Sequence, residues 1–113
     1  MVIITPILIL LVFLAVQSAI YFHAANVATA AASQGAAAGA PAGAAPATAV
    51  ASAQRTVTEL GGHTAHQPGV TMSDTFVVVS VEVTVPRIVP FFPSSVTRTM
   101  LEPRERFIPE SNR

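Results

Sequence analysis

The hydrophobic pattern divides the chain into an uninterrupted apolar opening and a later region in which apolar and polar positions alternate. Residues Val2–Phe22 are almost wholly apolar, and the first charged side chain of the sequence is Arg55. A hydrocarbon layer about 30 Å thick is crossed by roughly 20 helical residues, because each adds about 1.5 Å. The pattern therefore predicts a transmembrane helix over residues 1–23.

Both ends of this predicted helix carry residue types that suit them. Thr5 offers a capping hydroxyl and Pro6 is tolerated in a first turn, so the pair indicates the helix start. Tyr21, Phe22 and His23 have amphipathic rings, which favour the headgroup layer of a bilayer. The span is therefore expected to close near His23.

A secretory signal peptide is the alternative interpretation of this segment. The run Val16-Gln17-Ser18-Ala19 weakly resembles a cleavage site, and cleavage there would release a mature protein that starts near Ala19. The first residues carry no Lys or Arg, however, and the apolar run exceeds the roughly 7–15 residues of a signal peptide. We therefore expect the segment to be retained as a membrane helix.

Within the span, a polar amide lies beside small residues. A primary amide in hydrocarbon needs a partner, which leads us to expect that Gln17 bonds to a neighbouring helix. Ala15 and Ala19 form a pair of small residues four apart, with Ser18 beside them, and such pairs allow close helix approach. These four residues predict a helix–helix packing face, although they are also compatible with a span that has no role in assembly.

Alanine dominates the next segment. Residues 24–34 contain the best helix former in abundance, which predicts that the helix continues outside the bilayer as a narrow rod. Gly and Pro then recur from Gly35 to Pro46 and disfavour helix, so residues 35–46 are predicted to form a hinge or linker. The composition also fits a floating low-complexity spacer.

Residues 47–113 are expected to form a small head that begins with a second helix. Apolar positions recur at helical spacing over about 14 residues, and Gly61-Gly62 supplies a C-terminal stop. The expected buried face consists of Val50, Ala53, Val57 and Leu60.

Strands are predicted in the second part of the head. Phe76–Val85 alternates between Val and mostly polar residues, as in a half-buried strand. Ser95–Glu102 is rich in Thr and Val, and Gly69–Asp74 can add a short first strand through a turn at its end. The predicted fold class is α+β: a long N-terminal transmembrane helix with an Ala-rich rod, and an antiparallel sheet of two or three strands backed by the short helix.

The connection between the two longer strands has two interpretations. If exposed, Ile88, Val89, Phe91 and Phe92 would form an apolar docking loop. Alternatively these side chains fold under the sheet and complete a thin core, which we favour. The polar, proline-punctuated tail is expected to be mobile beyond Phe107.

Charge and chemistry narrow the classes of function. Six basic and six acidic residues balance to zero net charge, which gives no electrostatic basis for binding nucleic acid or anionic lipid. His63 and His66 have metal-like spacing, but a zinc site needs three or four converging ligands, and there is no Cys. With none of the usual catalytic motifs present, we expect no enzymatic activity, no metal and no cofactor.

The order of these features resembles a known family. An apolar helix runs into VQSAIYFHAANVATAAASQGAAAGA, followed by a Gly/Pro break, a helix closing in ELGG, and Val/Thr strands that lead to ERFIP. This arrangement resembles the TadE-like pseudopilins of actinobacterial type, which are minor pilin-like components of the Tad (Flp, type IVc) pilus system. The resemblance implies a non-catalytic, single-pass protein of the cytoplasmic membrane whose head lies outside the cytoplasm.

The same resemblance implies partners among the pilins and the assembly platform of the Tad/Flp system. Family members also carry a leader cut by a prepilin peptidase and an acidic residue just before the apolar run, and neither precedes Val2 here. We therefore expect the true start to lie upstream of Met1. The alternatives are an unrelated single-pass anchor that presents a small interaction domain, and a secreted protein after signal cleavage.

Overall fold

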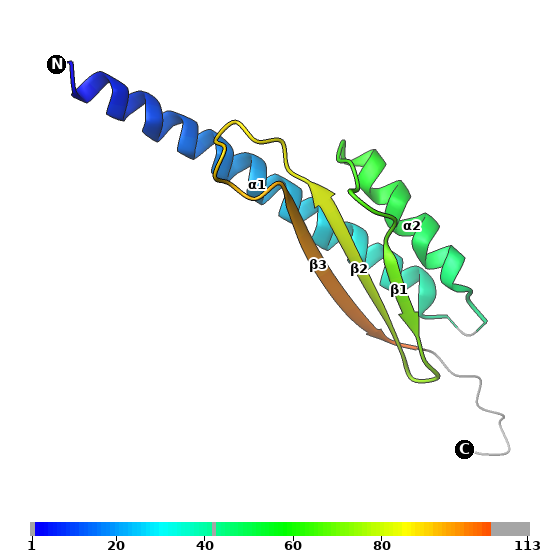
Figure 1. Ribbon diagram of the computed structural model, residues 1–113. Coiled ribbons are helices and arrows are strands. Elements are labelled where there is room, and N and C mark those ends of the chain that lie inside the picture. The colour runs from blue at the N-terminus through cyan, green and yellow to red at the C-terminus, as the bar shows by residue number, and fades with distance from the viewer. Residues whose placement is uncertain (1, 42, 105–113) are drawn as a thin grey trace, which may run out of the picture.

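The computed structural model describes residues 2–41 and 43–104 of the chain. Two helices are followed by three strands, and one helix is much longer than every other element (Figure 1). This arrangement confirms the predicted α+β class and its three-stranded alternative. The elements are α1 (Ile4–Gly39), α2 (Pro46–Glu59), β1 (Gly69–Met72), β2 (Phe76–Thr84) and β3 (Ser95–Pro103). The tail beyond Phe107, for which we expected mobility, lies outside the described residues.

The long helix α1 is continuous over 36 residues and ends at Gly39, beyond the predicted helical extension of residues 24–34. It begins at Ile4 with Ile3 as its N-cap, so Thr5 does not cap the helix and Pro6 sits inside the first turn, where proline is tolerated. At the other end it continues through Gly35 to Gly39, so the first part of the predicted linker is helical.

Packing explains why these glycines do not break the helix. A Cβ atom added at Gly35 would lie 3.1 Å from the Cβ of Ala53 and from a methyl group of Val79. At Gly39 it would lie 2.9 Å from the terminal methyl group of Met72. The backbone of α1 therefore approaches its neighbours closely at both glycines. These contacts oppose the helix penalty of glycine, which is about 1 kcal/mol.

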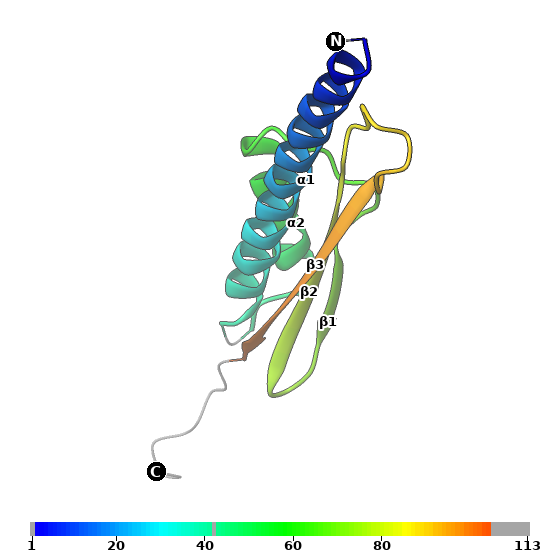
Figure 2. The same ribbon diagram turned by 90° about the vertical axis from the view of Figure 1, so that its left-hand side faces the viewer.

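We call residues 4–23 the inner half of α1 and residues 24–39 its outer half. Helix α2 folds back along the outer half (Figures 1 and 2). The connection turns at Gly43, whose φ of 84° favours glycine. Ala53 and Val57 are buried on α2, as predicted, together with Ala49 and Ser52. Val50 is only half-buried and Leu60 is 46% exposed, because the small residues face the alanine surface of α1.

The predicted stop of α2 is confirmed. Gly61 has a φ of 80°, and its N–H donates to the carbonyl oxygen of Thr58 at 3.1 Å. The N–H of Gly62 donates to the carbonyl oxygen of Val57 at 2.9 Å. These two bonds form the Schellman motif that terminates many helices.

The sheet has the order β1-β2-β3, and both pairs are antiparallel. Alternation in β2 is confirmed, because one face is buried and the other carries Ser80 and Glu82. The buried valines are Val77, Val79, Val81, Val83 and, just beyond the strand, Val85. On the outer face Ser80 lies opposite Thr99, whose hydroxyl donates to the Ser80 oxygen at 3.2 Å.

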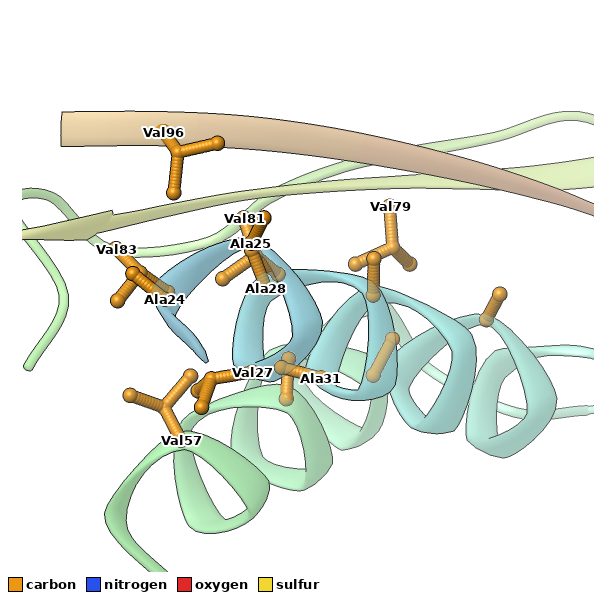
Figure 3. Close-up of a cluster of buried hydrophobic side chains, with 14 of the residues drawn as sticks. Ala24, Ala25, Val27, Ala28, Ala31, Val57, Val79, Val81, Val83 and Val96 are labelled. Carbon is orange, nitrogen blue, oxygen red and sulfur yellow. The ribbon is translucent and has the colours of Figure 1, made fainter. Parts of the chain in front are cut away.

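The outer half of α1 lies between the sheet and α2 (Figure 3). Its alanines face both neighbours, and Ala28, Ala31, Ala32 and Ala36 are completely buried. Residues 24–34 are therefore helical, as predicted, but they are the central layer of the head and do not form a free rod. The sheet is backed mainly by α1, whereas we had expected the short helix in that place. Alanine permits this because its small side chain allows close approach on two sides.

Candidate membrane anchor and packing surface

The N-terminal part of α1 projects beyond the head (Figures 1 and 2). Every residue from Val2 to Phe13 is exposed, and Leu14 is the first half-buried residue. Within the described residues, α1 is the one helix long and apolar enough to cross a membrane, with a mean hydropathy of 2.2 over 18 residues. An exposed apolar surface of this size is unfavourable in water, which fits a membrane-embedded segment.

The head first makes polar contact with α1 at Gln17. This side chain is completely buried, and its Nε2 donates to the carbonyl oxygen of Pro86 at 3.0 Å. Its Oε1 accepts hydrogen bonds from the backbone N–H groups of Ile88 at 2.6 Å and Val89 at 3.2 Å. The amide is therefore satisfied by the chain's own β2–β3 loop, which corrects our expectation that it would bond to a neighbouring helix.

The other members of the predicted packing face lie on more open parts of α1. Ala15 and Ala19 are exposed and Ser18 is half-buried. Ala19 borders an apolar hollow of about 320 Å³, which also has walls from His23, Gly62 and Val83. Packing of Ala15, Ser18 and Ala19 against other helices stays a prediction.

The β2–β3 loop combines the two interpretations made from the sequence. Val89 is 5% exposed and is turned inward, beneath the bonds to Gln17. Ile88 and Phe91 point outward and are 50% and 75% exposed. Phe92 is half-buried, with its ring centroid 5.9 Å from that of Phe91. Docking through this loop stays a prediction, with Ile88 and Phe91 as its accessible residues.

Arg104 ties the opposite end of the head together. Its guanidinium donates to the carbonyl oxygens of Ser73 at 3.1 Å and Ala44 at 3.3 Å, and its backbone N–H donates to Thr75. The arginine thus joins the α1–α2 connection to the β1–β2 turn. Arg104 lies in the polar, proline-punctuated C-terminal segment, where no local pattern distinguishes it from the neighbouring polar residues.

The histidines do not form a ligand cluster. The Nε2 of His66 lies 3.5 Å from a carboxylate oxygen of Glu82, and His63 borders the apolar hollow. Among residues 2–41 and 43–104, no group of three or more His, Cys, Asp or Glu could hold a metal ion.

Together these features define an α+β protein whose small head is built around the outer half of one long apolar helix. That helix is also where the chain is similar to known proteins, since residues 1–37 match the family model described as TadE-like protein. This similarity lies almost wholly within α1 and relates the N-terminal part of the chain to TadE-like proteins. The apolar helix fits a single-pass membrane protein. No curated protein and no solved structure shows a significant match.

Proposed function

We propose that this chain is a non-catalytic, membrane-anchored TadE-like pseudopilin that takes part in Tad/Flp pilus assembly or secretion. The observation that carries the proposal is the coincidence of the family match over residues 1–37 with the extent of α1. The inner half of this helix lies in the cytoplasmic membrane, and the head lies outside the cytoplasm.

The difference in exposure between the two halves of α1 limits where other subunits can bind. The sheet and α2 cover two sides of its outer half, so the inner half presents the larger open helix surface. There Ala15, Ser18 and Ala19 allow close approach of a second apolar helix. The hollow beside Ala19 offers space for a side chain from that helix. Pilins and the assembly platform are the expected partners, and a prepilin peptidase acts on the chain if its start lies upstream of Met1.

Retention of the helix is supported by the position of Gln17. Signal cleavage between Val16 and Ala19 would detach or expose the side chain that holds the β2–β3 loop. The head is therefore expected to remain joined to its membrane segment. Mass determination of the N-terminus in membrane and secreted fractions tests this directly, and a mature chain starting near Ala19 in the medium would contradict it.

The assembly role is tested by co-purification with other pilus components from native membranes in a mild detergent. Ala15→Leu and Ala19→Leu should reduce the recovered partners, because each adds a bulky side chain to the close-approach face. Val12→Leu is the matched control, since Val12 is 60% exposed on the same helix and remains apolar. Unchanged recovery for both alanine variants would argue against the packing face. Normal pili in cells that lack the protein would argue against the function itself.

A further inference from the structure

The apolar surface of α1 does not stop where the head begins. The head meets the helix at Leu14 and Gln17, yet Phe22 beyond them is still 64% exposed. Five residues of helix separate Gln17 from Phe22, which is about 7.5 Å along the axis. The loop held by Gln17 therefore lies at a level where α1 itself still has lipid-compatible side chains.

The β2–β3 loop has the composition of a surface that contacts lipid. Between Pro86 and Ser94 the only charged residue is Arg87. The exposed side chains of Ile88 and Phe91 continue the apolar surface of the neighbouring helix, beside which the loop lies in both ribbon views (Figures 1 and 2). Glu82, near this end of β2, is half-buried and accepts a hydrogen bond from the Ser95 hydroxyl at 2.7 Å, whereas Glu102 lies at the opposite end of the sheet.

The backbone of the loop is also suited to a layer with little water. Irregular backbone is tolerated at membrane depth only where its polar groups find partners in the protein. Pro86, Pro90 and Pro93 have no N–H group to satisfy. Gln17 provides partners for the N–H groups of Ile88 and Val89, and Phe92 N–H donates to the carbonyl oxygen of Val89 at 3.2 Å.

We propose that the β2–β3 loop is a second membrane contact of the protein. Ile88 and Phe91 insert into the boundary between headgroups and acyl chains of the same bilayer that α1 crosses. Lipid is the occupant because the exposed patch is continuous with the exposed apolar side of α1 and faces the membrane end of the head. Arg87, exposed beside the patch, supplies the basic group that meets lipid phosphates. Gln17 holds the loop at this depth.

The absence of Trp from the chain gives a direct test. The variant Phe91→Trp places the one tryptophan of the protein in the loop, where it can be excited selectively over Tyr21, and Leu101→Trp is the matched control. Leu101 is 60% exposed on β3, toward the end of the head that Arg104 closes. Each full-length variant is placed in phosphatidylcholine nanodiscs, which are open to solvent on both sides, with and without brominated acyl chains.

Phe91→Trp should be quenched by the brominated lipid and protected from aqueous iodide, with an iodide quenching constant several-fold below that of Leu101→Trp. Equal iodide quenching of the two variants, or no quenching of Phe91→Trp by brominated lipid, would overturn the proposal. Lipid quenching of both variants would also overturn it, because the head would then lie flat on the bilayer. The inference requires α1 to cross a membrane but not a role in pili, so this result is independent of the co-purification experiment.

Discussion

The two halves of α1 are both helical and both lack charge, but they bury their side chains in opposite ways. The inner half exposes large residues such as Leu8 and Leu11, each 55% exposed, whereas the outer half buries Ala28 and Ala31 completely. Side-chain size accounts for the difference. Large side chains suit a lipid environment, while methyl groups let the sheet and α2 approach one helix from two sides. The same helix therefore serves as a membrane segment and as the core of the head.

Enlarging a side chain in the outer half should break this arrangement most severely. Ala28→Leu adds three carbon atoms between α1 and β2, where Ala28 has no exposed surface (Figure 3). We expect a loss of about 3 kcal/mol in the unfolding free energy of the head, because overpacking forces the layers apart. Amide hydrogen exchange of β2 in detergent micelles measures this loss. The same change at exposed Ala15 is the control, and equal exchange in both variants would contradict the assigned core.

Gln17 lies near the end of the inner half, and its removal should have the next largest effect. Gln17→Leu leaves the carbonyl of Pro86 and the N–H groups of Ile88 and Val89 without their partner. We expect a cost of about 2 kcal/mol, seen as faster hydrogen exchange at those two amides. Gln34→Leu is the control, because Gln34 is exposed on the same helix. Hydrogen exchange that is no faster than in the control would show that the hydrogen bonds of Gln17 do not stabilise the loop.

Gly35 sharpens the comparison by opposing helix propensity to packing. Gly35→Ala should favour the helix in isolation, but the added Cβ meets Ala53 and Val79 at 3.1 Å. We expect packing to prevail and the unfolding free energy to fall by about 1 kcal/mol. Thermal unfolding followed by circular dichroism measures the net effect, with Gln34→Ala as the exposed neighbour. A higher melting temperature for Gly35→Ala would mean that propensity decides at this site.

The smallest effect is expected in the inner half. Leu8→Ala removes a large apolar side chain that the head does not touch, so the unfolding free energy of the head should change by no more than about 0.5 kcal/mol. Hydrogen exchange of β2 again reports the result. A loss near 2 kcal/mol, as for a buried leucine, would mean that the head extends further along α1 than Leu14.

The parts of this fold that could be predicted from the sequence are those where neighbouring residues differ clearly in polarity or in backbone preference. Val and polar residues alternate in β2, and Gly61-Gly62 marks the end of α2, so both features were predictable within a few residues. In the alanine segment Asn26, Thr29 and Ser33 recur at helical spacing and mark the side away from the buried residues. Alanine at most other positions leaves open which elements cover the buried side. The glycines of α1 resemble helix breakers unless the close approach of other layers is known.

The candidate site was predictable only in part, for a similar reason. The sequence singled out Gln17 and the loop residues separately, as a polar group in hydrocarbon and as an apolar connection. Their hydrogen bonds join positions 71 and 72 apart in the chain. Pairing at such a distance depends on the length of β2 and on its register along α1, which no local motif encodes.

The continuity of α1 has a mechanical consequence. Its backbone runs without interruption from Ile4 to Gly39, so the membrane segment and the central layer of the head form one rigid shaft. Rotation of the head relative to the membrane segment would require a break in this helix. The first turn of the backbone, at Gly43, comes only after the part of α1 that packs against the head. Any subunit that rotates or lifts the span in the bilayer therefore turns or lifts the polar outer face of the sheet by the same amount.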